Sequence, residues 1–154
     1  MLGNRFITSH GLDIAVREYE FHFEERHIGH SNALHSVLKG VGSYHVGPLA
    51  RYNLNFDKLT PLAKEVAQDV KMQPVVNNPF KSIVVRSIET LYAFDLALQI
   101  IAEYEQPSEP AIHVTPVPGI GFGASEAPRG TLYHRYRLDD EGLITDAKIV
   151  PPTA

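Results

Sequence analysis

One short run in the sequence presents an arginine from a stiffened bend. In Glu126-Ala127-Pro128-Arg129-Gly130 the proline fixes its own φ and drives Ala127 towards an extended conformation, while Gly130 frees the backbone on the other side. A guanidinium is always charged and offers five N–H donors in a fixed fork. An arginine displayed in this way suits an anion, or a site that requires a fixed positive charge. A structural ion pair, for example with Glu126, fits the spacing equally well.

A cluster of histidines forms a second candidate site. The four histidines lie within fourteen residues, with three glutamates among them: His22, His27, His30 and His35, with Glu20, Glu24 and Glu25. On a helix, His27 and His30 would share one face, where imidazoles can bind zinc or a similar ion. The spacing matches no established zinc signature, and Gly29 weakens a helix between them. A polar surface or partner-facing segment is the competing interpretation.

A glycine-rich stretch is the third candidate. Residues 119–124, Gly-Ile-Gly-Phe-Gly-Ala, match the loose G-x-G-x-x-G/A dinucleotide fingerprint and follow an apolar stretch. That fingerprint requires a helix whose N-terminus faces the pyrophosphate, but Pro128 and then a β pattern follow here. We therefore expect a flexible or closely approached loop at 119–124 and no nucleotide-binding βαβ unit.

The composition limits the chemistry that the chain can perform. The 154 residues carry a net charge of −4 and include no cysteine. Disulfides, iron–sulfur ligation and thiolate metal sites are thereby excluded from this chain. The basic residues are scattered, which argues against nucleic acid as a partner. No apolar run approaches the roughly 20 residues of a membrane span, and the N-terminal residues lack a signal-peptide layout, so we expect cytoplasmic residence.

Two capped starts predict the principal helices. Thr60-Pro61 and Asn78-Pro79 each place a capping side chain before a proline at the first helical position, and these helices should run to about Met72 and Tyr104. The second helix would be about 40 Å long. Its apolar side chains cover nearly its whole circumference, which is typical of a buried helix. Because the chain has little material to surround it, we expect the chain to belong to something larger or to pack on a partner.

Shorter elements are expected on both sides of these helices. Ser31 to Lys39 is predicted as a short helix capped by Ser31. For the preceding segment two alternatives stay open, a strand within residues 14–26 or a helix from Val16 to His27. Strands are predicted at 111–117, 131–138 and 143–150, the last two joined by a turn at 139–142. The expected fold class is therefore α+β, predominantly helical with a long buried helix and a small C-terminal antiparallel β region, with residues 1–154 as part of a larger single domain.

Several stretches resemble the large, catalytic subunit of nickel–iron hydrogenases. The strongest runs from Ser125 to Tyr136, and it continues through Asp140–Ile144 to Lys148–Thr153. Upstream, Val46–Asn53 and His30–Ser36 also fit. The resemblance covers nearly the whole chain, and its details are most similar to the cytoplasmic, soluble branch of the family.

The resemblance implies an enzyme that reversibly oxidises H2. Its site is a nickel and an iron bridged by cysteine thiolates, with cyanide and carbon monoxide on the iron, and two cysteine pairs near the ends of the subunit hold the metals. The implied partners are an iron–sulfur small subunit, together with diaphorase-type subunits that pass electrons to NAD(P) or a similar carrier. Neither cysteine pair occurs here, so we expect an internal fragment with no metal ligands, no bound cluster and no activity of its own.

Four residues carry over from the resemblance to a pocket around the diatomic ligands. Arg129 matches the arginine above the bimetallic site, with two implied roles: a hydrogen bond to a cyanide, and help in cleaving H2 as a base or electrostatic partner. A resting guanidinium is a poor base, so the first role is physically safer. Pro128 matches the proline that lines the pocket, while Pro152 and Thr153 match the segment whose hydroxyl donates to the other cyanide. A buried anionic ligand needs such fixed donors.

Two other functions stay open. Some relatives of this subunit, in respiratory complexes, have lost the metal cysteines and serve as structural or quinone-binding scaffolds, although the retained run at 126–130 together with Thr153 argues against this. The other is a small histidine-metal protein built on the four clustered histidines. Other residues at the four cysteine positions of a full-length gene would favour the scaffold, and stoichiometric zinc that is lost on His27→Ala would favour the metal protein.

Overall fold

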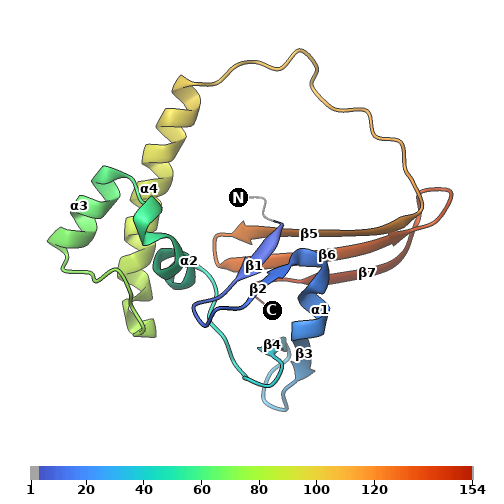
Figure 1. The fold of residues 1–154 in the computed structure, drawn as a ribbon, viewed down its shortest axis with the longest axis horizontal. Coiled ribbons are helices and arrows are strands. Elements are labelled where there is room, and N and C mark those ends of the chain that lie inside the picture. Colours follow the sequence, from blue (N-terminus) through green and yellow to red (C-terminus); the bar gives the residue numbers. More distant parts are fainter. Residues whose placement is uncertain (1–3, 154) are drawn as a thin grey trace. The chain divides into compact units, whose positions relative to one another are not determined.

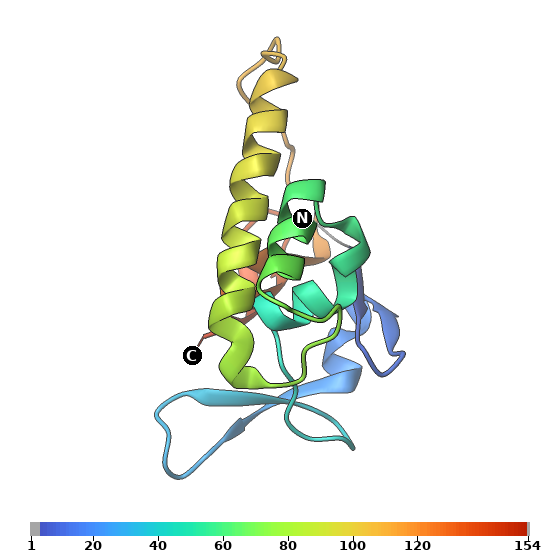
Figure 2. The same ribbon diagram turned by 90° about the vertical axis from the view of Figure 1, so that its left-hand side faces the viewer.

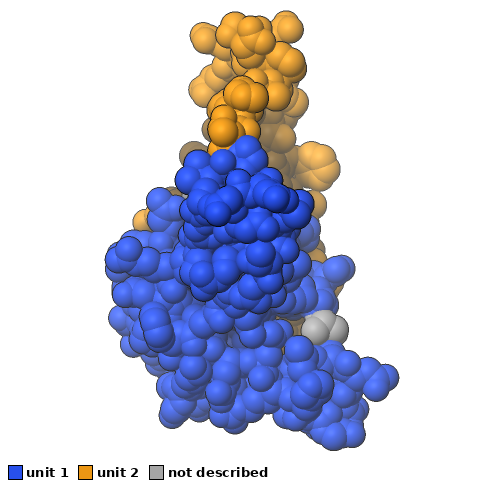
Figure 3. Space-filling model, turned by 90° about the vertical axis from the view of Figure 1, so that its right-hand side faces the viewer, with its two compact units in different colours: residues 1–47, 116–154 blue, residues 48–115 orange. Residues whose placement is uncertain are grey.

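The computed structural model describes residues 4–153, which fall into two compact units. Unit 1 comprises residues 1–47 and 116–154, and unit 2 comprises residues 48–115 (Figure 3). Within the described range, unit 1 contains the paired strands and unit 2 contains the longer helices (Figure 1). Both helices and antiparallel sheets are present, so the predicted α+β class is confirmed.

A three-stranded antiparallel sheet forms the C-terminal part of unit 1. Its strands, in order across the sheet, are β5 Gly119–Ala127, β6 Gly130–Leu138 and β7 Ile144–Val150. The strands predicted at 131–138 and 143–150 are confirmed. The loop predicted at 119–124 is wrong, because pairing with the whole length of β6 holds this glycine-rich segment in a strand. The strand predicted at 111–117 is also wrong, since these exposed residues have no partner strand.

Two tight turns connect the sheet. β5 and β6 are joined by the two residues Pro128 and Arg129, with Ala127 directly opposite Gly130. β6 and β7 are joined by the turn predicted at 139–142, where the Asp139 carboxylate accepts hydrogen bonds from two backbone N–H groups, at 2.9 and 3.0 Å. An aspartate in this position accepts hydrogen bonds from backbone N–H groups of the same turn, so the sequence alone predicts the turn.

The N-terminal part of unit 1 contains two small hairpins that the sequence did not predict. β1 Arg5–Ile7 pairs with β2 Asp13–Ala15, and β3 Phe23–His27 pairs with β4 Leu34–Leu38. Between the hairpins lie a 3-10 turn, η1 Val16–Glu18, and the short helix α1 Tyr19–His22. Residues 14–26 thus contain both of the alternatives left open, strand at the ends and helix in the middle.

The helix predicted at 31–39 is wrong, since Leu34–Leu38 is strand β4. The Ser31 hydroxyl does accept a backbone hydrogen bond, but from Ala33, two residues on, at 3.1 Å. That geometry belongs to a local serine turn rather than to a helix cap. Pairing of β4 with β3 then outweighs the helical pattern of the apolar residues.

An aromatic cluster forms the core of unit 1. The Tyr19 ring stacks on Tyr133 with 4.2 Å between ring centroids, and on Phe23 with 4.6 Å. Phe6 lies 5.1 Å from Tyr19 in a tilted arrangement. These rings come from β1, α1, β3 and β6, so their packing fixes the N-terminal segment on the central strand of the sheet. Burying each large ring contributes about 1.5–3 kcal/mol relative to leaving it exposed.

Unit 2 is helical. It contains α2 Pro48–Asn55, η2 Phe56–Lys58, α3 Pro61–Asp69, η3 Pro79–Lys81 and α4 Ser82–Ala102 (Figure 2). Both predicted caps are present, because Thr60 Oγ1 accepts from the Ala63 N–H at 3.4 Å and Asn78 Oδ1 accepts from the Phe80 N–H at 3.0 Å. The helix α3 ends three residues earlier than predicted, and a residue with positive φ, Lys71, follows it.

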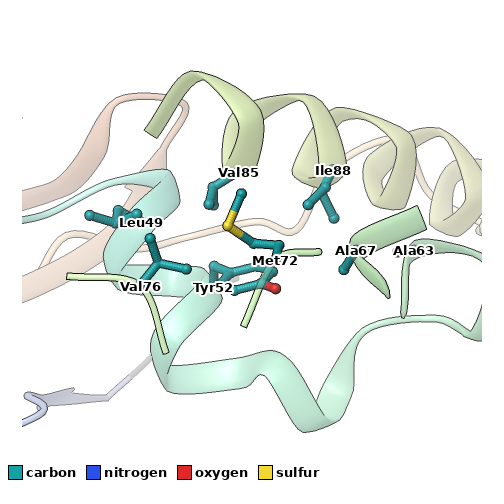
Figure 4. Close-up of a cluster of buried hydrophobic side chains, with 8 residues drawn as sticks. All are labelled: Leu49, Tyr52, Ala63, Ala67, Met72, Val76, Val85 and Ile88. Carbon is teal, nitrogen blue, oxygen red and sulfur yellow. The ribbon is translucent and has the colours of Figure 1, made fainter. Parts of the chain in front are cut away.

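The core of unit 2 lies where α2 and α3 pack against the N-terminal half of α4. Its buried side chains are Leu49, Tyr52, Ala63, Ala67, Met72, Val76, Val85 and Ile88 (Figure 4). An ion pair between Arg51 and Glu89, with 2.8 Å between Nη2 and Oε2, ties α2 to α4 beside this core. None of the helices in the described range combines the length and apolar character that a membrane crossing requires.

The long helix α4 confirms the helix predicted after Pro79 but is largely uncovered. Only Val85 and Ile88 of its side chains are fully buried. Phe94 and Leu98 are both 68% exposed. The burial expected from its sequence is therefore not met within this chain, because, among the described residues, only Val84, Val85, Ile88 and Tyr92 of α4 pack in the core with α2 and α3.

Candidate functional site

The arginine of the Glu126–Gly130 run lies at the tip of the β5–β6 hairpin. Its Nε–H donates a hydrogen bond to Thr153 Oγ1 at 2.9 Å, across 24 positions of sequence. The contact arises because β7 runs antiparallel to β6 and returns the chain to the Pro128-Arg129 end of the sheet. Two of the four residues predicted for the site are thus in direct contact, and both are exposed in this chain.

Glu126 has a different partner in the structure. Its Oε1 accepts a hydrogen bond from Thr131 Oγ1 at 2.7 Å, and the two residues are paired across the hairpin. The Thr131 hydroxyl and the Glu126 carboxylate therefore interact across the two strands, at the residue pair next to Ala127 and Gly130. Arg129 is oriented instead by Thr153, so its guanidinium donates to a neutral hydroxyl acceptor rather than to the Glu126 carboxylate.

The residues Val46 and Gly47 pack directly against this turn. Gly47 has a φ of +88°, and a Cβ built on it would lie 2.5 Å from the carbonyl oxygen of Arg129. Gly130 has a φ of +146°, and its Cβ would lie 2.5 Å from Cγ2 of Val46. Both segments carry the family resemblance, but nothing local in the sequence indicates that these two distant glycines face each other.

A polar network lies on β6 away from the turn. Glu20 Oε1 accepts hydrogen bonds from Tyr133 OH at 2.9 Å and from Arg135 Nε at 2.6 Å. Arg135 also forms an ion pair with Asp146 on β7. The hydrogen bond from Arg135 lowers the pKa of Asp146, and burial raises the pKa of Tyr133. These contacts attach α1 to the sheet.

The clustered histidines are not arranged as a metal site. His27 ends β3 and His30 follows in the connecting turn, so the shared helical face predicted for them does not exist. The closest recorded ring contact, between His30 and His35, has 6.2 Å between centroids. The neighbouring carboxylates have other partners, since Glu25 contacts Lys148 Nζ at 3.1 Å. Residues 4–153 contain no group of three or more His, Cys, Asp or Glu side chains that could hold a metal ion.

Comparison with known proteins identifies the relatives of this chain. No family model matches it. The iron–sulfur subunit of an F420-non-reducing hydrogenase from Archaeoglobus profundus is 38% identical over 120 residues, covering 75% of this chain and 24% of that protein. The NAD-reducing hydrogenase HoxS subunit beta of Cupriavidus necator is 32% identical over 154 residues, covering 90% of this chain and 31% of that protein.

A solved structure gives the same result for the fold. The crystal structure of an NAD+-reducing nickel–iron hydrogenase in the H2-reduced state matches 95% of this chain and 35% of its own chain, with a TM-score of 0.76 and 27% identity. The chain is homologous to hydrogenase subunits, which are oxidoreductases of hydrogen metabolism. It spans between 24% and 38% of the length of the curated relatives it matches.

That relative is named as a nickel–iron hydrogenase, which raises the question whether the residues of this chain could bind such a metal centre or lie beside it. Because the sequence has no cysteine and the described residues form no metal-ligand group, they do not fit the role of metal ligands. The adjacent guanidinium and hydroxyl of Arg129 and Thr153 do fit a role as donors to an anion held beside such a centre. Pro128 shares the turn with Arg129, and Pro152 directly precedes Thr153.

Proposed function

We propose that this chain is part of the catalytic large subunit of a soluble nickel–iron hydrogenase, an enzyme that reversibly oxidises H2. The observation that carries the proposal is the hydrogen bond between Arg129 and Thr153, which joins two stretches of the strongest resemblance at one end of the sheet. The match to the NAD+-reducing enzyme supports the same assignment. In the complete enzyme, electrons would leave through an iron–sulfur subunit, then through diaphorase-type subunits to NAD(P) or a similar carrier.

Arg129 and Thr153 would act as fixed donors to the anionic ligands of the centre. Among residues 4–153, the only recorded hydrogen bond of Arg129 is the one from its Nε–H, so its terminal N–H groups can donate to a ligand. Because Thr153 Oγ1 accepts from Arg129, its own O–H is directed to a different acceptor. The contact therefore holds two donors side by side, the terminal N–H groups of Arg129 and the O–H of Thr153. Pro128 and Pro152, which precede them in the sequence, restrict the backbone at both positions.

A nickel–iron centre, when bound in the complete enzyme, would supply the activation of H2, and the residues of this chain would supply a preorganised electrostatic environment beside it. A positive charge that is already in place when the reaction begins costs no reorganisation during it. Arg129 serves here as a cation and hydrogen-bond donor. It does not act as the base that accepts a proton from H2, since its guanidinium stays charged in proteins.

The first prediction concerns Arg129 in the complete enzyme. The full reading frame that encodes this chain is expressed with its partner subunits, and hydrogen-dependent dye reduction is measured for Arg129→Lys. Loss of the forked donor should lower the rate by about 10²-fold, as for other single preorganised donors, while nickel and iron contents are retained. Arg137→Lys is the matched control, because Arg137 is an exposed arginine on β6 outside the turn.

Two results would contradict the proposed function. One is a wild-type complex that shows no hydrogen-dependent dye reduction, and the other is an Arg129→Lys enzyme as active as the control. The DNA on both sides of the coding segment provides a simpler check. Two cysteine pairs encoded there support the hydrogenase, whereas other residues at those positions favour a scaffold relative that has lost the metals.

A further inference from the structure

We propose that Val46 and Gly47 are positioning residues for Arg129. These two residues pack against the Pro128-Arg129 turn, and this close contact determines the position of the Arg129 guanidinium. The inference rests on the proposed function, because the position of Arg129 matters through the anion that it contacts.

The first support is the closeness of the two backbones. A Cβ on Gly47 would approach the Arg129 carbonyl oxygen to 2.5 Å and its carbonyl carbon to 3.0 Å. A methyl group there would overlap backbone atoms, which cannot rotate away as a side chain can. The peptide that carries Arg129 therefore lies against residue 47 with no space for any side chain larger than hydrogen.

The second support is that the contact is reciprocal. A Cβ on Gly130 would meet Val46 at Cγ2, 2.5 Å away, and at Cβ, 2.9 Å away. Each segment thus has a glycine at the point of contact, Gly47 in one and Gly130 in the other, because a side chain there would clash with the opposite segment. Since Gly130 is also the first residue of β6, the turn is held by the sheet on one side and by residues 46 and 47 on the other.

The third support is that two glycines of unit 1 with similar backbone angles, Gly40 and Gly119, have no such contact. Gly40 has a φ of +76°, close to that of Gly47, and Gly119 has a φ of +158°, close to that of Gly130. A Cβ on either would meet nothing within 4 Å. Backbone strain from an L residue is therefore comparable within each pair, and only the contact with the Arg129 turn differs.

A displaced turn would change the site in a definite way. The Nε of Arg129 and Oγ1 of Thr153 are 2.9 Å apart, so a shift of the turn of about 1 Å breaks this hydrogen bond. The Thr153 hydroxyl then loses the interaction that directs its proton, and both donors leave the positions that the anionic ligands require. Misplacement of that size can cost about 10²-fold in rate.

The test compares Gly47→Ala with Gly40→Ala in the complete enzyme. We expect Gly47→Ala to lower hydrogen oxidation by at least about tenfold and to shift the infrared bands of the diatomic ligands, with nickel and iron retained. Gly40→Ala should stay within about twofold of wild type with unshifted bands, because its Cβ touches nothing. The infrared bands report the surroundings of the ligands, which a merely structural weakening of the fold would leave unchanged.

A second pair of variants decides the matter if Gly47→Ala does not accumulate. Gly130→Ala should lose activity, whereas the double variant Val46→Gly/Gly130→Ala should recover part of it, because both atoms of Val46 that would clash, Cγ2 and Cβ, are removed. Unshifted bands and full activity in Gly47→Ala, or no recovery in the double variant, would overturn the inference. A wild-type complex without these infrared bands would instead contradict the proposed function, so the two failures are distinguishable.

Discussion

Tyr133 and Tyr52, one in the core of each unit, differ in what their hydroxyl groups contact. Tyr133 is 1% exposed, and its hydroxyl donates to Glu20 at 2.9 Å. Tyr52 is 4% exposed, and its hydroxyl has no hydrogen-bond partner in the part of the chain that the structure describes. Burial raises the pKa of both phenols, so both remain protonated at neutral pH. One hydroxyl thus links elements, while the other is a cost of placing tyrosine in a core.

Replacing each tyrosine by phenylalanine should lower the free energy of unfolding at Tyr133 but not at Tyr52. Tyr52→Phe removes a buried hydroxyl without a partner, so we expect the free energy of unfolding to stay equal or to rise by up to about 1 kcal/mol. Tyr133→Phe removes a hydrogen bond to a carboxylate and should lower it by about 1–3 kcal/mol. Urea unfolding of the two purified variants measures both. A Tyr52→Phe protein destabilised as much as Tyr133→Phe would show that the Tyr52 hydroxyl has a partner.

The sequence predicts Arg129 and Thr153 as site residues, but it does not predict all of the residues that contact them. Proline before and glycine after Arg129 indicated a presented arginine because their effects on the backbone are local. The resemblance supplied Thr153, and the structure brings the two into contact. Val46 and Gly47 were not identified as site residues, since a close approach between backbones distant in sequence leaves no local pattern beyond the presence of glycine.

At the scale of elements, three predictions that depended on neighbouring residues succeeded, those of the Thr60 cap, the Asn78 cap and the 139–142 turn. Thr60 and Asn78 cap helices through hydrogen bonds to backbone groups two or three residues on, and Asp139 organises a turn in the same way. Two of the errors concern β4 and β5, which owe their conformation to partner strands, and the third is the strand predicted at 111–117, a segment that has no partner strand among the described residues. A pairing energy that depends on another segment is not encoded in the periodicity of the strand itself.

The contact between β6 and β7 gives the sheet a dependence on pH. Arg135 lowers the pKa of Asp146, chiefly through a hydrogen bond. A carboxylate whose pKa is lower in the folded state stabilises the fold above its ordinary pKa of 3.8, and that stabilisation is lost as the pH falls through the lower, folded value. We expect the unfolding midpoint in urea, followed from neutral to acid pH, to fall less steeply at the acid end in Asp146→Asn.

A suitable control for this pH profile is Asp140→Asn, because Asp140 is an exposed carboxylate in the 139–142 turn. Its profile should follow that of the wild type. Identical acid profiles for Asp146→Asn and the wild type would show that the Arg135 contact contributes nothing measurable to stability.

For the whole molecule, the principal observation is apolar surface without a partner. The C-terminal half of α4 exposes large side chains that no other part of the described chain covers: Phe94, Leu98, Ile100 and Ile101. The chain spans only 35% of the solved hydrogenase chain that it matches. If the proposed function holds, the remaining parts of that subunit are the natural cover for this face, because apolar helices of this kind belong in the interior of large domains.

The isolated 154-residue chain should therefore self-associate and show no hydrogen-dependent dye reduction. Phe94 and Leu98 lie four residues apart on one face of α4 and are equally exposed, so replacing both by glutamine removes apolar surface from a single patch. We expect sedimentation velocity to show a smaller average size for this double variant than for the wild type. Ile112→Gln, which removes an 89% exposed side chain outside α4, should leave self-association unchanged. In the complete enzyme the same double variant should impair assembly, because the patch is then an internal surface; a fully assembled, active variant would show that nothing covers it.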